Sequence, residues 1–179
     1  MGGVAGGRLA ATVTAAGGLG MIGMGSTGSV SLLQAELRRV PGMFGIGLVH
    51  WVIRKEPGLL DAALAAGPAL LSVSFSDDWS WVERAHSAKI PLPHRYTTAA
   101  EPCRPKTPGR RVGGARAEGG GHGEAKVATL PLLDAVLNVV SVPVLAGGAS
   151  RRREASPPCW PRVPAAHGWA RACRPARRR

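Results

Sequence analysis

The sequence is poor in aromatic residues, in cysteine and in long apolar stretches. Its 179 residues include two Phe, one Tyr, five Trp and three Cys. The cysteines form neither a C-x-x-C pair nor a cluster with histidine, and their odd number argues against a closed disulfide framework, so we expect no metal site. No apolar run reaches the length of a membrane span, and the first residues lack the charged-then-apolar layout of a signal peptide. We therefore expect a soluble, cytoplasmic protein with no membrane partner.

Acidic residues are also scarce, because 23 Lys and Arg stand against 11 Asp and Glu. The basic excess is confined to two stretches. Residues 91–117 hold six basic residues and one acid, and residues 149–179 hold nine and one. The same stretches hold ten of the fifteen prolines and all three cysteines, Cys103, Cys159 and Cys173. The chain is better described as a nearly neutral protein with two basic, proline-rich segments than as a basic protein.

Outside those two segments, helix-like and strand-like patterns alternate along the chain. Alanine-rich residues 10–16 predict a helix that ends at Gly17, and Ser29 is expected to cap a helix that runs to Val40. Further helices are expected after Pro57, after Asp77 or Asp78, and over residues 132–140. Short apolar runs predict buried strands at residues 19–22, 44–49, 70–75 and 142–146. Apolar strands separated by helices indicate a parallel sheet that is covered on both faces.

This repeat suits either a barrel or a doubly wound sheet. Glycine runs at the strand–helix junctions favour the barrel, whose enzymes build their sites where strands end, although generic glycine-rich loops remain the alternative. A complete eight-unit barrel takes about 250 residues, more than this chain has. The predicted fold class is therefore α/β, as an incomplete TIM-type (β/α) barrel with parallel strands. It is expected over residues 1–148, with residues 91–117 disturbed, followed by a disordered basic tail at residues 149–179.

Four segments together carry a family resemblance. GGVAGGRLAATVTAAGGLGMIG near the start, SVSF at a central strand, AEGGGHGE and SVPVLAGG occur in an order and spacing that resemble the nitronate monooxygenase (2-nitropropane dioxygenase) family. The resemblance covers about residues 1–90 and 117–148. It implies FMN as the cofactor and the oxidation of nitronates or nitroalkanes, with oxygen as the acceptor. A weaker resemblance to FMN-dependent enoyl reductases implies the same fold and cofactor.

The resemblance also implies which residues form the site. His122 matches the histidine that removes the proton next to the nitro group, a role that suits an imidazole because it titrates near neutrality. Glycine-rich backbone is expected to lie against the cofactor and around its phosphate, since glycine allows close approach. The expected cofactor-binding residues are Met1, Gly2 and Gly3, then Gly120 and Gly121, and finally Ala146, Gly147 and Gly148.

The chain departs from the family pattern at several positions. Ala115 stands where a glutamine usually reaches the cofactor, and Gly47 stands where an asparagine is expected, so each loses a side-chain hydrogen bond to the flavin. The strand expected before Met1 and the second phosphate loop are also missing. We therefore expect a truncated chain, and an inactive remnant of the family is an alternative to a working enzyme.

The other histidines, two tryptophans and two aspartates are expected to have structural roles and no part in catalysis or binding. His50, His86, His94 and His167 are expected at the surface. Trp79 and Trp81 are expected to pack in the core or at its rim rather than to stack on a substrate. Asp77 and Asp78 are expected to cap a helix.

The two basic segments show no apolar periodicity, and proline in residues 91–117 opposes the strand–helix–strand unit expected there. We hypothesise that both segments are translations of GC-rich DNA in a shifted reading frame. Translating the coding DNA in its other two frames tests this, because one of them should then restore an alternating β/α pattern. The competing interpretation is a basic protein whose arginines bind nucleic acid phosphates. No aromatic platform or recognised module accompanies the arginines, which disfavours it.

Overall fold

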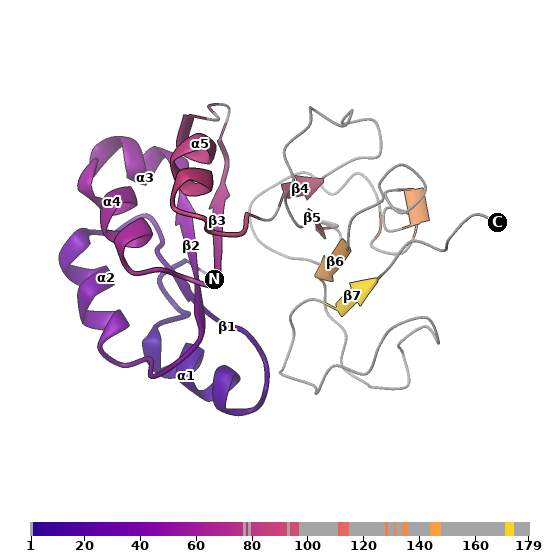
Figure 1. Cartoon of the computed structure of the whole chain (residues 1–179), viewed down its shortest axis with the longest axis horizontal. Coiled ribbons are helices and arrows are strands. Elements are labelled where there is room, and N and C mark those ends of the chain that lie inside the picture. Colours follow the sequence, from indigo (N-terminus) through magenta and orange to yellow (C-terminus); the bar gives the residue numbers. More distant parts are fainter. Residues whose placement is uncertain are drawn as a thin grey trace. The chain divides into compact units, whose positions relative to one another are not determined.

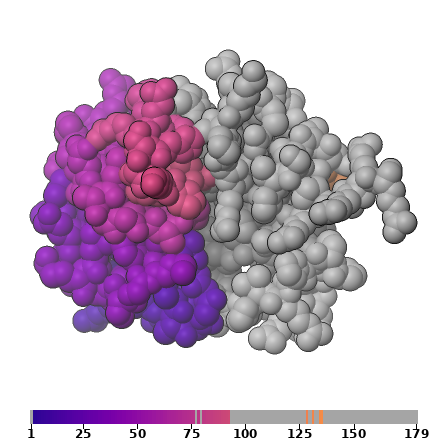
Figure 2. Space-filling model, viewed as in Figure 1, coloured from indigo at the N-terminus to yellow at the C-terminus, as the bar shows by residue number. Residues whose placement is uncertain are grey.

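The computed structural model describes residues 2–76, 78, 80–92, 94–96, 111–114, 128, 131, 134–135, 144–147 and 171–173. The chain divides into two compact units, Met1–Leu92 and Pro93–Arg179, and each is described by itself. Figure 1 labels the elements of both units, and Figure 2 shows one face of the first unit in colour.

The first unit is built from parallel strands that alternate with helices. Its strands form one sheet in the order β1-β2-β3, which is also their order in the chain. Ile22 of β1 lies beside Ile46 of β2, which lies beside Leu71 of β3. The elements are α1 (Gly7–Ala15), β1 (Gly20–Gly23), α2 (Val30–Leu37), β2 (Phe44–Val49), α3 (His50–Lys55), α4 (Gly58–Ala65), β3 (Leu70–Ser74) and α5 (Ser80–Ser87).

The core of this unit lies between the sheet and its helices. Helix α2 contacts both α1 and α4, so these helices form one layer (Figure 1). The row Ile22, Ile46 and Leu71 is fully buried and shares one cluster with Leu33 of α2 and Leu59 of α4. Because side chains alternate along a strand, the neighbours of that row point to the opposite face of the sheet.

Local sequence signals explain most of these elements. Ser29 accepts a hydrogen bond at Oγ from Leu32 N at 3.2 Å, which confirms its predicted role as a helix cap. Gly17 follows α1 with φ of 83°, a conformation that glycine adopts without strain, and it ends the helix as predicted. The strand expected at residues 44–49 has the predicted bounds. Helix α3 was not predicted, because it follows β2 directly and has no side-chain cap.

The second unit contains a four-stranded sheet. Its order is β4-β5-β6-β7, with the first three strands parallel and β7 antiparallel to β6. The strands are β4 (His94–Tyr96), β5 (Arg111–Gly114), β6 (Val144–Gly147) and β7 (Arg171–Cys173). Of the helix expected at residues 132–140, residues 134 and 135 are helical and the others lie outside the described residues.

Two of these strands lie where the sequence opposed regular structure, and one lies in the basic tail. β4 and β5 fall within residues 91–117, and β7 falls within residues 149–179. The difference has a simple physical reason, because none of the three strands contains a proline. The prolines of these segments stand outside the three strands in the sequence, so they take no position in the ladder. The overall composition of residues 91–117 and 149–179 therefore gave no sign of the short proline-free runs that pair as strands.

Candidate functional site

The carboxyl ends of β1, β2 and β3 lie at one edge of the first sheet, since the strands are parallel and in register. Three connections leave that edge: the turn after Gly23, the start of α3 at His50, and the segment from Phe75 to Ser80. Parallel α/β folds place their functional groups at this edge. The candidate site of the first unit is therefore built from these connections and from the sheet face beneath them.

The sheet face opposite the buried row is poor in side chains near this edge. Gly23, Gly47 and Ser72 lie side by side on neighbouring strands, one residue beyond the row Ile22, Ile46 and Leu71. A Cβ atom placed on Gly47 would meet nothing closer than Ile22 O, at 3.8 Å, so there is space above this glycine. The three residues place mainly backbone at this position of the sheet, with Gly23 buried and with Gly47 and Ser72 partly exposed.

The N-terminal turn closes against the same edge. Gly3 N donates to Gly23 O at 3.2 Å, and Gly23 N donates to Ala5 O at 2.7 Å. A Cβ atom on Gly25 would lie 2.7 Å from the carbonyl carbon of Gly2, so only glycine permits this approach of two backbone segments. Gly2 and Gly3, two residues expected to bind the cofactor, are thus located beside the carboxyl end of β1. Their role stays a prediction.

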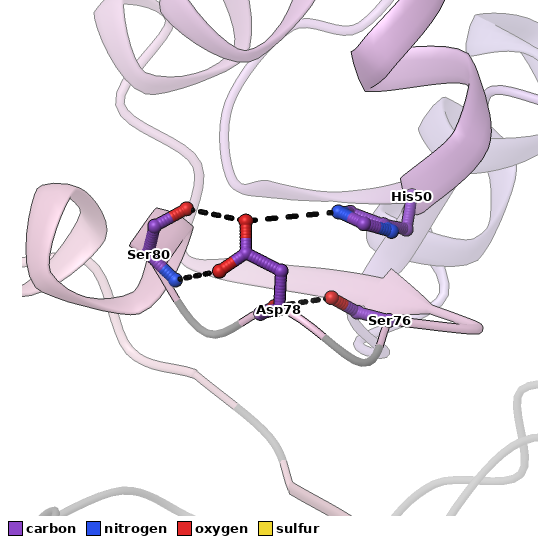
Figure 3. Close-up of polar contacts among 4 residues, drawn as sticks. All are labelled: His50, Ser76, Asp78 and Ser80. Carbon is purple, nitrogen blue, oxygen red and sulfur yellow. Dashed lines mark hydrogen bonds and ion pairs between the residues drawn. The ribbon is translucent and has the colours of Figure 1, made fainter.

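A polar cluster occupies the ends of β2 and β3 (Figure 3). His50 Nε2 lies 4.0 Å from Asp78 Oδ2, and the His50 side chain is 16% exposed. Ser80 donates to Asp78 twice, from N to Oδ1 at 2.8 Å and from Oγ to Oδ2 at 2.7 Å. Ser76 Oγ donates to the backbone carbonyl of Asp78. These bonds hold the Asp78 carboxylate so that it faces the imidazole.

Two aromatic rings flank this cluster along the chain. Trp51 follows His50, and Phe75 precedes Ser76. Their ring centroids are 5.0 Å apart with the planes tilted by 41°, and both residues are more than two-fifths exposed. Phe75 has φ of 60°, which is uncommon for a bulky residue and costs backbone energy. The end of β3 therefore carries a strained residue next to the polar cluster.

Two expected phosphate-loop residues are placed in the second unit. Ala146 and Gly147 end β6, beside Gly113 and Gly114 of β5 in parallel register. They thus occupy the carboxyl end of a parallel strand, the position expected for a loop that binds through backbone N–H groups. Their role stays a prediction.

The other predicted site residues lie outside the described residues. These are the proposed catalyst His122, together with Met1, Gly120, Gly121 and Gly148. Ala115, Trp79 and Asp77 also lie outside them. Of the two expected helix caps, Asp78 does accept a hydrogen bond from Ser80 N at the start of α5. Trp81 is in the core, as expected, with 5% of its surface exposed.

Two histidines differ from the expectation of surface residues. His50 is largely covered and faces Asp78, and His86 has Nε2 buried with no hydrogen-bond partner among the described residues. The expectation was wrong for both because each side chain turns toward the fold instead of the solvent. His50 had one usable signal in the sequence, since it directly follows a predicted strand of a βα repeat.

Within the described part of the chain, no three His, Cys, Asp or Glu side chains come together in a way that would hold a metal ion. The described helices also include none with the length and apolar character needed to cross a membrane.

Comparison with known proteins gives the fold. No protein-family model matches the chain, and no curated protein matches its sequence. Among solved structures, FabK from Thermotoga maritima is 20% identical with a TM-score of 0.69, over 84% of this chain and 49% of FabK. A nitroalkane oxidase from Streptomyces ansochromogenes is 22% identical with a TM-score of 0.62, over 84% of this chain and 57% of the oxidase.

Both neighbours are proteins of the TIM-barrel type, and the chain spans about half the length of each. Parallel strands that alternate with helices, in chain order across the first sheet, agree with that fold. The prediction of a TIM-type α/β fold is thereby confirmed, and this protein has part of the barrel fold of these two structures.

Proposed function

We propose that the chain is an FMN-dependent oxidoreductase that oxidises nitronates or nitroalkanes with oxygen. The observation that carries the proposal is the glycine backbone at the carboxyl edge of the first sheet, where Gly2 packs against Gly25 and Gly47 leaves space above it. A flat ring system needs such a surface, free of side chains, to bind close to a backbone. The sequence resemblance and the fold shared with a nitroalkane oxidase support the same activity.

The described residues fit the proposed cofactor. In the first unit, Gly2, Gly3 and Gly47 would lie against its ring. For the second unit, the resemblance alone implies that Ala146 and Gly147 belong to a loop whose backbone N–H groups bind a phosphate. Met1, Gly120, Gly121 and Gly148 complete the set of cofactor-binding residues that the resemblance implies. When bound, FMN supplies the electron acceptor that the side chains of this protein lack. Gly47, in place of the family's asparagine, offers no side-chain hydrogen bond, so backbone contacts carry more of the binding.

His122 is the proposed base. Its imidazole takes the proton from the carbon that bears the nitro group, a step that a positioned base accelerates by about 10² to 10⁴-fold. The second substrate is oxygen, which needs no side chain to bind it. No part of this proposal requires a metal ion or a nucleic acid partner.

The test begins with the whole chain produced in the presence of riboflavin. We expect yellow protein with the flavin absorption bands and consumption of oxygen when 2-nitropropane is added in its neutral form, which still carries the proton that His122 would remove. His122→Ala is expected to lower turnover at least about 100-fold at unchanged flavin content. His167→Ala is the matched control and is expected to keep full turnover. Flavin-loaded protein whose turnover survives His122→Ala would rule out this mechanism.

A second candidate is reduction of an enoyl thioester, which the weaker resemblance to FMN-dependent enoyl reductases favours. It predicts oxidation of a nicotinamide cofactor that depends on an enoyl thioester and not on a nitronate. Colourless protein that takes up no added FMN would contradict both activities and favour the inactive remnant.

A further inference from the structure

His50 and Asp78, here called the His50–Asp78 pair, are arranged like a ligand-binding histidine whose ring is oriented by a carboxylate. A carboxylate faces one nitrogen of the imidazole, at 4.0 Å, and is itself held by two hydrogen bonds from Ser80. The contact recorded for this imidazole in the described part of the chain runs through Nε2, and Nδ1 is the other ring nitrogen. A protonated imidazole has two N–H donors, so one remains for a ligand when Asp78 engages the first.

The position of the pair supports a role at the site. His50 directly follows Val49, the last residue of β2, and Asp78 follows the end of β3. Both side chains therefore lie at the carboxyl edge of the sheet (Figure 3). The side chain of His50 is mostly covered yet retains 16% exposure, which leaves the ring accessible to a small molecule.

The flanking aromatic rings define what else the ligand would carry. Trp51 and Phe75 present apolar surface at the same edge, and the positive φ of Phe75 shows that its placement there costs energy. Exposed rings of this kind pack against the apolar part of a small ligand. The charge and the apolar surface together fit an anionic group attached to a compact hydrocarbon.

We propose that His50 binds an oxygen of a small organic oxyanion, a nitronate or a carboxylate, and that Asp78 is the positioning residue that holds the imidazole. Trp51 and Phe75 would cover the hydrocarbon part. The nitronate form of this inference rests on the proposed function, because it names how the same site would hold its substrate. Binding of a carboxylate does not depend on that function.

The test measures binding, by isothermal titration calorimetry on the whole chain. Isobutyrate is the anionic probe, and isobutyramide is its neutral counterpart of nearly the same shape. We expect isobutyrate to bind at least about tenfold more tightly, because a charge-assisted hydrogen bond exceeds a neutral one by about that factor. Equal dissociation constants for the two probes would overturn the proposal, and this comparison needs no variant that has to fold.

Variants then assign the effect to the pair. His50→Ala is expected to raise the dissociation constant of isobutyrate about tenfold, and His50→Gln, which keeps an N–H donor without the charge, is expected to raise it less. Asp78→Asn should raise it about threefold, because the ring loses its orientation. Lys55→Gln, which removes a charge from the same helix α3, is the matched control and should change nothing. An equal effect of Lys55→Gln and His50→Gln would overturn the assignment to His50.

The two proposals fail in different ways. If isobutyrate binds through His50 and nitronates are not turned over, the proposed function is wrong and the anion site stands. If nitronates are turned over and His50→Gln leaves both KM and the dissociation constant of isobutyrate unchanged, the function stands and the anion site is wrong. An effect of His50→Gln on KM with little change in kcat supports a binding role for the imidazole.

Discussion

The two units of the chain differ in the length of their strands and in the sequence that separates the strands. In the first unit, strands of four to six residues bury Ile22, Ile46 and Leu71 against helices that alternate with them. In the second unit, strands of three or four residues pair through their backbones, and two of them end in glycine, Gly114 and Gly147. The strands of the first sheet thus carry large apolar side chains into a core, whereas two strands of the second end in residues without a side chain.

The sequence between the strands accounts for this difference. Apolar residues at helical spacing, a serine cap and glycine stops separate the strands of the first unit. Residues 97–110, between β4 and β5, instead contain Pro102, Pro105 and Pro108 and only scattered apolar residues. Backbone pairing needs only short stretches without proline, whereas a covering helix layer needs a sustained pattern. Strands thus tolerate a change in composition that amphipathic helices do not.

The largest expected effect comes from removing part of the first core. Leu71 is fully buried, so Leu71→Ala should lower the free energy of unfolding by about 2–5 kcal/mol. We expect hydrogen exchange to speed up in peptides from β2 and not in those from β5, because the described members of the buried cluster all belong to the first unit. Leu9, 51% exposed, supplies the control Leu9→Ala, with a change within about 0.5 kcal/mol. Equal acceleration in both units would contradict the comparison.

A pair of glycines tests how tightly the first unit is packed. A Cβ atom on Gly20 would lie 1.9 Å from the carbonyl oxygen of Ala10, so Gly20→Ala forces α1 away from β1. We expect a loss of about 1–3 kcal/mol, the usual cost of overpacking. Gly47→Ala meets only Ile22 O, at 3.8 Å, and should raise stability by about 0.5–1 kcal/mol because alanine loses less entropy on folding. Urea unfolding of the flavin-free protein measures both, and equal losses would show that Gly47 has no space above it.

The contact between α1 and α2 makes the first unit sensitive to acid. Glu36 Oε2 accepts a hydrogen bond from Gly7 N, at the start of α1, at 2.6 Å, and Arg39 Nη1 lies 2.6 Å from Oε1. The bond from Gly7 N, aided by Arg39, lowers the pKa of the Glu36 carboxyl below its usual value. Its contribution is therefore fully present above the pKa of the unfolded chain and is lost as the pH falls through the lower pKa of the folded chain.

Glu36→Gln tests this contribution. We expect it to cost about 1 kcal/mol at pH 7, the usual value of a helix cap, and much less at a pH below the lowered pKa of Glu36 in the folded chain. Urea titrations at the two pH values measure the difference, and Glu56→Gln is the control for loss of an acid elsewhere in the unit. A cost independent of pH would mean that the carboxylate charge is not what stabilises the start of α1.

Much of the first unit could be predicted from its sequence, and the site could be predicted less well. Strands at residues 44–49 and 70–75 and the cap at Ser29 follow from apolar runs and local polar residues, which act within a few positions. The His50–Asp78 pair joins residues from two connections, and the register of β2 and β3 brings them together. No local pattern encodes that register, so His50 was expected at the surface. His122 was selected from a motif alone and lies outside the described residues.

The smallest effect concerns how the helices of the first unit end. Gly17 and Gly67 follow α1 and α4 with positive φ, and Lys89 follows α5 in the same way with φ of 56°. Lys89 N donates to His86 O at 2.8 Å and Ile90 N donates to Ala85 O at 3.0 Å, so this turn closes the helix.

A left-handed conformation costs a residue with a Cβ about 1–2 kcal/mol. Glycine removes that cost but adds about 0.5–1 kcal/mol of chain entropy. Lys89→Gly should therefore stabilise the unit by about 0.5 kcal/mol in urea unfolding. Lys55→Gly, at the last residue of α3, should do the opposite, and a loss in both variants would mean that Lys89 makes contacts that outweigh its backbone strain.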